Sequence, residues 1–260
     1  MRRLLFSFRW AARHSALAAG PVSRAWLFLT LLALPAKRRL MSGTAVPVRL
    51  RLEGRPRVFW FSDESELFAL EEIFGEGEYA AAAGGRPAVI VDLGSNVGQA
   101  ALWFRSRFPE ARLLCVEPDP RTFATLRRNV GNDPLVTLRH AAVTAEDGPV
   151  VIERTPHSSW GTRVNGSSGN GLEVPGLSLS TLLADGLIDQ VDVLKVDIEG
   201  MEHAALAASP ALARARLVVG ELHPDLLPMP LERALEDMRL NGGFAHAELR
   251  GDIFVLSRET

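Results

Sequence analysis

The spacing of hydrophobic residues changes several times along the chain, and each change predicts a different element. Apolar and polar residues alternate over 46–52, and an apolar and aromatic run follows at 57–61, which predicts a hairpin that turns near Gly54. Ser62 and Asp63 then offer a cap for a helix over 66–74, where apolar residues recur at helical spacing. These elements form a small unit ahead of the main domain.

The main domain begins at Ala88 with an apolar run to Leu93, which is typical of a strand buried on both faces. The pattern then predicts strands over 112–116, 136–143, 191–198 and 215–222, and helices over 99–108, 121–130, 180–187, 200–208 and 231–241. Strands that alternate with helices indicate right-handed crossovers and a parallel sheet. A last hairpin, over 245–249 and 253–257, is predicted by the turn at Arg250-Gly251-Asp252. The predicted fold is α/β and Rossmann-like, with a mostly parallel central sheet and a C-terminal antiparallel hairpin.

Between the third and fourth of these strands the pattern becomes irregular. Residues 150–153 are compatible with a short strand, and 155–176 are rich in Gly, Ser and Asn, which predicts a loop. His157, Ser158, Ser159 and Trp160 lie on this loop. The loop either closes over a substrate or is a disordered linker.

The chain divides into an extension at 1–44, an appendage of hairpin and helix at 45–87, and a cofactor-binding domain at 88–260. Residues 1–40 contain eight basic and no acidic residues, and their apolar run at 25–36 is shorter than the ~20 residues that cross a bilayer. Three interpretations stay open: an export signal, a segment lying on an anionic membrane, or a disordered extension before a start at Met41. The segment is left out of the fold prediction.

Charge and cysteine content narrow the function classes. The chain has 29 basic and 31 acidic residues, so without residues 1–40 the balance is 21 basic against 31 acidic. An acidic domain binds a phosphate backbone poorly, so no nucleic-acid partner is expected. The single cysteine, Cys115, lies in an apolar run, so we expect a buried thiol, no disulfide and a cytoplasmic protein.

A glycine-containing turn, VDLGSNVG at 91–98, follows the first strand of the main domain. Its G-x-x-x-G spacing lacks the middle glycine that makes room for a dinucleotide pyrophosphate. S-adenosylmethionine has no phosphate, and its amino acid part can bond the turn and the preceding acid. The residues of this turn expected to line a cofactor site are Asp92, Gly94, Ser95, Asn96 and Gly98.

Acidic residues end the next strands. Glu117 stands at the end of the second strand, where an acid can accept both hydroxyls of a ribose. His140, after the third strand, is placed to approach an adenine. In the fourth strand, VDVLKVDIEG, Lys195, Asp197 and Glu199 share one face at the carboxyl end. Unpaired buried charges are costly, so these groups must pair or serve a site. A structural Lys195–Asp197 pair is one interpretation, and it is compatible with a role in a site.

With these motifs the chain resembles the FkbM-type family of class I, S-adenosylmethionine-dependent methyltransferases. The resemblance covers about residues 60–224 and is most distinctive in the pattern V-D-x-x-K-x-D-x-E-G-x-E; the other similar segments are SDESELFALEEIFGEGEY, VDLGSNVG, CVEPDP and VVGELH. The loop at 158–171 has no clear counterpart in the family. The resemblance implies methyl transfer, usually to a hydroxyl oxygen of a sugar, polyketide or lipid-linked acceptor, and a small-molecule or glycan partner. We expect Asp197 to contribute to the cofactor site as well.

An alcohol must lose its proton during methyl transfer, and a positioned base usually accelerates such a step. His223 is the predicted base, with Asp197 or Glu199 orienting it, although a histidine before Pro224 could merely cap the turn. A weaker alternative is that Asp197, Glu199, Glu221 and His223 hold Mg²⁺ or Mn²⁺, which Lys195 would oppose.

Two other functions compete with the methyltransferase. An NAD-dependent oxidoreductase is disfavoured by the missing middle glycine and by the charged fourth strand. The other is a non-catalytic module that binds S-adenosylmethionine or a nucleotide and uses residues 1–40 for peripheral membrane contact.

Overall fold

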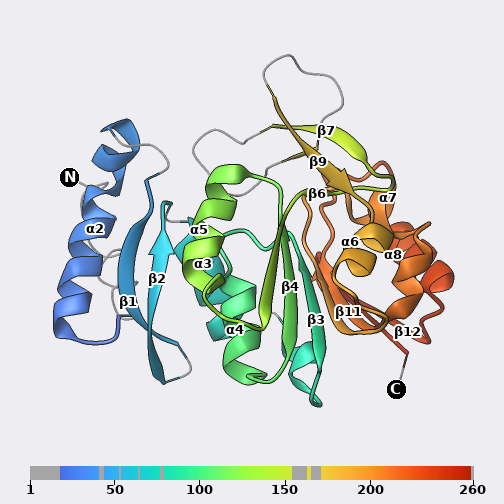
Figure 1. Cartoon of the computed structure of the whole chain (residues 1–260), viewed down its shortest axis with the longest axis horizontal. Helices are drawn as coiled ribbons and strands as arrows, with labels where there is room; N and C mark the ends of the chain where they lie inside the picture. The colour runs from blue at the N-terminus through green and yellow to red at the C-terminus, as the bar shows by residue number, and fades with distance from the viewer. Residues whose placement is uncertain are drawn as a thin grey trace.

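The computed structural model describes residues 18–40, 44–52, 54–63, 65–76, 79–153, 163–164 and 171–258. Figure 1 shows a central sheet with helices on both faces, a hairpin and a helix at the N-terminal side, and a small second sheet above one edge. The loop residues 157–160 that the sequence singled out lie outside the described residues.

The central sheet has seven strands in the order β12-β13-β11-β10-β3-β4-β5. Their bounds are β3 Val89–Leu93, β4 Arg112–Glu117, β5 Val136–His140, β10 Val191–Val196, β11 Ala215–Glu221, β12 His246–Arg250 and β13 Ile253–Ser257. The five strands from β11 to β5 are parallel, and β13 pairs antiparallel with both β11 and β12. This arrangement confirms the predicted α/β fold with its C-terminal antiparallel hairpin.

The strand order reverses between β3 and β10, because the chain first builds outward to β5 and then returns to the other side of β3. In open α/β sheets, ligands bind beyond the carboxyl ends of the strands at such a reversal. The fold therefore places the turn after β3 and the end of β10 at the expected binding edge.

Alternation of side chains along the buried strands creates a separate core on each face of the sheet. Ile90 and Cys115 pack into the core under α4 and α5, whereas Val91 and Leu114 pack into the core under α6, α7 and α8. The bounds of these helices are α4 Gln99–Arg107, α5 Pro120–Val130, α6 Leu179–Asp185, α7 Glu202–Leu206 and α8 Leu231–Gly242. Cys115 is fully buried, as predicted.

A second sheet, with strand order β6-β9-β7-β8, forms in the segment before α6, where the sequence predicted mainly a loop. Its strands are β6 Ala142–Val143, β7 Gly148–Glu153, β8 Arg163–Val164 and β9 Leu172–Leu177. The predicted strand 136–143 is broken at Ala141, and residues 172–177 are a strand rather than a loop. Pro175 and Gly176 gave the segment a loop-like composition, but antiparallel pairing with β7 and burial of Val174 favour the strand.

The N-terminal elements pack together beside the domain. The hairpin of β1 (Val46–Leu52) and β2 (Arg55–Phe61) forms where it was predicted, and α3 (Ser65–Glu71) continues into a π-helical turn, Glu72–Glu76. A short 3₁₀ helix, Ala80–Ala83, follows.

The sequence prediction omitted residues 1–40, but in the structure Pro21–Leu40 form a helix, α2, that lies against β1. Leu27 and Leu31, one turn apart, are buried in this contact, and the Trp26 indole donates a hydrogen bond to the Pro47 carbonyl at 3.0 Å. No helix among the described residues combines the length and the hydropathy needed to cross a membrane.

Asn129, the penultimate residue of α5, joins the appendage to the domain. Its Nδ2 donates to the carbonyls of Trp60 at 2.9 Å and Val97 at 2.7 Å, and its Oδ1 accepts from the Trp60 N–H at 2.7 Å. Because Val97 belongs to the turn after β3, one amide side chain holds the hairpin, α5 and that turn in a fixed relation.

Candidate active site

The acidic residues singled out in the sequence gather at the carboxyl edge of the sheet. Alternation places Asp92, Glu117, Lys195, Asp197 and Glu221 on the same face of β3, β4, β10 and β11. This is the face that packs under α4 and α5, where Ile90 and Cys115 lie earlier on the same strands.

The turn after β3 takes left-handed backbone conformations at Gly94 (φ 75°), Asn96 (φ 48°) and Gly98 (φ 97°). A Cβ at Gly94 would lie 1.7 Å from the Asp197 carbonyl oxygen, and one at Gly98 would lie 3.0 Å from Leu126 Cδ1. From the sequence, these glycines were expected to allow a sharp turn and the close approach of a ligand. The structure gives an additional reason, because the protein's own backbone and helices already fill the space of a side chain.

The Ser95 side chain stabilises the turn internally. Its hydroxyl donates to the Asp92 carbonyl at 2.9 Å and accepts from the Val116 N–H at 3.1 Å. The side chain therefore joins β3 to β4. The backbone of Ser95 is engaged as well, because its N–H donates to the Val116 carbonyl at 2.9 Å and its carbonyl accepts from the Gly98 N–H at 2.8 Å.

Glu117 lies directly beside the turn, as the predicted cofactor site requires. Its Oε2 accepts from the Asn96 N–H at 3.0 Å, and its Oε1 accepts from the Asp119 N–H at 2.9 Å. Burial raises the pKa of Glu117 to about 8, although the two N–H groups and Lys195 oppose the shift. A group that donates hydrogen bonds to this carboxylate would favour its charged form.

Lys195 connects the turn with the end of β10. Its Nζ lies 3.1 Å from Asp92 Oδ1 and 3.6 Å from Asp197 Oδ2, and it donates to the Gly94 carbonyl at 2.6 Å and the Leu93 carbonyl at 3.3 Å. The structure thus contains the Lys195–Asp197 pair that the sequence suggested. Asp92 is a second acidic partner, and both Lys195 and Asp92 are buried.

His223 follows β11 and lies among three carboxylates. Its Nε2 is 3.5 Å from Glu199 Oε2 and 3.8 Å from Asp197 Oδ1, and its Nδ1 is 2.8 Å from Glu202 Oε1. Burial lowers the pKa of His223, but the hydrogen bond and charge of Glu202, together with Asp197 and Glu199, raise it to about 9. The sequence analysis named Asp197 or Glu199 as the orienting acid, whereas the short contact is with Glu202.

Glu202 is the site residue that the sequence analysis missed. It is the first residue of α7, is fully buried, and ends the pattern V-D-x-x-K-x-D-x-E-G-x-E. The signal that could have identified it is an acidic residue in the first turn of a helix that directly follows the charged end of β10, because a buried carboxylate needs partners.

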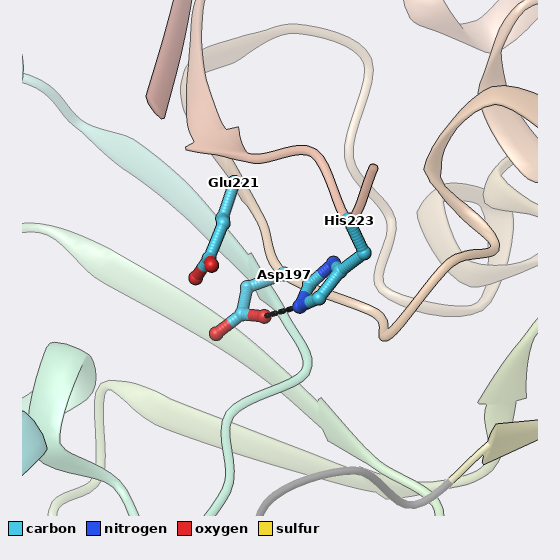
Figure 2. Close-up of side chains that lie close together, drawn as sticks. All are labelled: Asp197, Glu221 and His223. Carbon is cyan, nitrogen blue, oxygen red and sulfur yellow. Dashed lines mark ion pairs between the residues drawn. The ribbon is translucent and has the colours of Figure 1, made fainter. Parts of the chain in front are cut away.

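Asp197, Glu221 and His223 converge, as Figure 2 shows, and each offers one possible metal-ligand atom within 4.8 Å of the others. Glu199, the fourth residue of the metal alternative, approaches His223 but is outside this group of three.

His140 lies at the end of β5, opposite Glu117 in the pairing of β5 with β4. Its Nε2 lies 2.9 Å from the Pro118 carbonyl, and its ring packs against Phe123 with centroids 5.0 Å apart. These contacts tie the end of β5 to the segment that follows Glu117.

Known proteins with similar sequences indicate the family to which these site residues belong. Residues 92–239, more than half of the chain, match the family described as the methyltransferase FkbM domain. The chain is 27% identical over 173 residues to a hexuronic acid methyltransferase, AglP, of Haloferax volcanii, covering 65% of this chain and 70% of the relative. It is 28% identical over 175 residues to a 2-O-methyltransferase, NoeI, of Sinorhizobium fredii, covering 58% of this chain and 70% of the relative.

Among solved structures, the chain is similar to a methyltransferase FkbM from Methylobacillus flagellatus, with 14% identity and a TM-score of 0.49. The match covers 98% of this chain and 58% of the other.

Proposed function

Because the chain belongs to the FkbM methyltransferase family, we propose that it transfers the methyl group of S-adenosylmethionine to a hydroxyl oxygen of a sugar-type acceptor. The observation that carries this proposal is that two groups of side chains lie on either side of the strand-order reversal. Glu117 contacts the turn at Asn96 on one side, and His223 lies near Asp197 and Glu199 on the other. Family membership excludes the oxidoreductase alternative.

Unsatisfied acceptors support the methyl-donor site. Asp92 Oδ2 and Asn96 Oδ1 are buried and have no hydrogen-bond partner among the described residues. Such atoms cost ~1–3 kcal/mol each unless a hydrogen-bond donor reaches them. The ammonium and hydroxyl groups of S-adenosylmethionine are donors of the required kind. We propose that Asp92 and the turn at 94–98 bind its amino acid part and that Glu117 accepts from its ribose.

When bound, S-adenosylmethionine supplies an electrophilic methyl group. The protein must hold the acceptor hydroxyl in line with that methyl group and remove its proton. We propose that Nε2 of neutral His223 accepts this proton, because Nδ1 already faces Glu202. Asp197 and Glu199, on the Nε2 side, then stabilise the imidazolium that forms.

The sugar-type acceptor is inferred from the relatives, one of which is named for hexuronic acid and one for 2-O-methylation. The test is methyl transfer from labelled S-adenosylmethionine to a panel of hexuronic acids and other hydroxylated sugars, with and without EDTA. Methylated sugar in both conditions is the expected result. Loss of turnover in EDTA would favour the metal alternative, and donor binding without transfer to any acceptor would favour the non-catalytic module.

The pH profile of turnover is expected to reflect the charge on His223. With its pKa at about 9, the imidazole is mostly protonated at neutral pH and cannot accept a proton. At saturating S-adenosylmethionine, the acceptor kcat/KM should rise about tenfold per pH unit up to an inflection that lies above 6.5 and no higher than 9. A flat profile between pH 6 and 8 would exclude His223 as the base. Stability changes in the opposite direction: the raised pKa stabilises the fold below pH 6.5, and this contribution is lost as the pH rises through 9.

We also propose that the outer face of α2 binds an anionic membrane surface. Val22 and Leu29 are 83% and 61% exposed and lie on one side of the helix, opposite Leu27 and Leu31. Residues 1–40 add eight positive charges and no negative one. Arg24, on the same helix, is exposed. Exposed apolar groups in a segment of basic sequence fit the interface of an anionic bilayer, where each basic residue contributes about 1 kcal/mol.

Vesicle flotation tests this proposal. The protein should float with vesicles of phosphatidylglycerol and phosphatidylcholine, float less with phosphatidylcholine alone, and lose binding in Leu29→Glu. Leu240→Glu is the matched control, because Leu240 is 59% exposed on α8. A dimer that Leu29→Glu dissociates, or equal flotation of both variants, would contradict membrane binding.

A further inference from the structure

The carboxylate of Glu202 joins two separate parts of the site. Its Oε1 accepts a hydrogen bond from the Gly200 N–H at 3.1 Å and from the Ile198 N–H at 3.2 Å, and it lies 2.8 Å from His223 Nδ1. One oxygen atom therefore contacts both the turn after β10 and the imidazole that follows β11.

The contact with His223 selects a tautomer. A carboxylate can only accept, so Nδ1 must carry a proton to form the hydrogen bond with Glu202. In the neutral ring, Nε2 then holds the lone pair, and Nε2 is the atom that faces Asp197 and Glu199. Without Glu202, neither the tautomer nor the rotation of the ring would be fixed from this side.

The contact with the turn fixes a second site residue. Glu199 has φ 55° and Gly200 has φ 95°, so two successive residues adopt the left-handed region. For glutamate this conformation is unfavourable and persists only where the surroundings hold it. The two N–H bonds to Glu202 flank Glu199 on both sides and hold it in that conformation.

We propose that Glu202 is a positioning residue that sets the tautomer and direction of His223 and, through the same oxygen, the turn that carries Glu199. This inference rests on the proposed function in which His223 is the base. A purely structural role would be to satisfy the N–H groups around the start of α7, with no effect on His223.

Glutamine and alanine substitutions separate these roles. Oε2 of Glu202 has no hydrogen-bond partner among the described residues, so Glu202→Gln keeps Oε1 as the acceptor and changes only the other position. Glu202→Ala removes the acceptor altogether. The matched control is Glu232→Gln, an exposed acid in the first turn of α8.

Turnover and the tautomer of His223 are the two readouts. In Glu202→Ala, kcat should fall about 10- to 100-fold, the range for residues that orient a functional histidine, while the Kd for S-adenosylhomocysteine stays within about twofold. Glu202→Gln should recover most of the lost kcat, and Glu232→Gln should match the wild type. An unchanged kcat in Glu202→Ala, or an equal loss of kcat and affinity, would overturn the proposal.

The tautomer is read independently of activity. Nitrogen NMR of histidine-labelled protein, at a pH where the ring is neutral and with His223 assigned from His223→Gln, should show a protonated Nδ1 in the wild type and in Glu202→Gln. A protonated Nε2 in the wild type would refute the proposal even if Glu202→Ala does not fold. If His223→Ala keeps full turnover, the proposed base is wrong, whereas the NMR result still reports on Glu202.

Discussion

Replacing Glu117 with alanine is expected to lower the affinity for S-adenosylhomocysteine by about two to four orders of magnitude. A hydrogen bond to a charged group contributes about 1.5–3 kcal/mol, and two ribose hydroxyls would donate to this carboxylate. The loss is then about 3–6 kcal/mol, at 1.4 kcal/mol for each tenfold change. The substitution also removes the acceptor of the Asn96 N–H, which loosens the turn that faces the amino acid part.

Isothermal titration with S-adenosylhomocysteine measures this effect directly. Glu117→Gln keeps the size of the side chain and one acceptor oxygen, and should lie between the wild type and Glu117→Ala. Glu110→Ala, at an exposed position shortly before β4, should bind like the wild type. Unchanged affinity in a folded Glu117→Ala variant would remove the basis for the proposed methyl-donor site.

Replacing His223 with alanine is expected to slow methyl transfer by about 10² to 10⁴-fold while leaving donor binding intact. This is the usual contribution of a positioned base. The affinity should persist because the turn at 94–98 follows β3 and Glu117 ends β4, whereas His223 follows β11. Removing the imidazole also leaves the buried carboxylate of Glu202 without one of its partners, so some loss of stability accompanies the kinetic effect.

Single-turnover measurements at saturating S-adenosylmethionine separate chemistry from binding. The rate constant should fall in His223→Ala, with an unchanged Kd for S-adenosylhomocysteine and an unchanged circular dichroism spectrum. His203→Ala is a suitable control, because the His203 imidazole is engaged with Asp237 of α8, at 3.2 Å. A His223→Ala variant with the rate of the wild type would show that another group removes the proton.

The regular part of the fold was predictable because its central strands are rich in apolar residues. In β3 and β10 nearly every side chain is buried, and such strands are recognisable without any partner. The segment of β9 has Pro175 and Gly176 in its interior, and it becomes a strand only through its neighbour β7. The helix α2 was likewise not predicted, because the burial of Leu27 and Leu31 depends on the surface that β1 provides.

The candidate site was predictable where its residues follow strand alternation. Asp92, Glu117 and Lys195 lie at strand ends, so their common face follows from parity alone. Glu202 could not be placed in this way, because its contact with His223 depends on how the turn at 198–200 folds back. The glycine at 94 was recognised, but the reason for it, contact with the end of β10, is visible only in three dimensions.

The near contact between Gly94 and the Asp197 carbonyl has a consequence for how such an enzyme can diversify. Any larger residue at 94 would drive the ends of β3 and β10 apart, and with them the carboxylates and the histidine on either side. Substitution of Gly94 is therefore expected to disturb the site as a whole. We expect changes in acceptor preference to arise in segments that can vary without separating Gly94 from the Asp197 carbonyl.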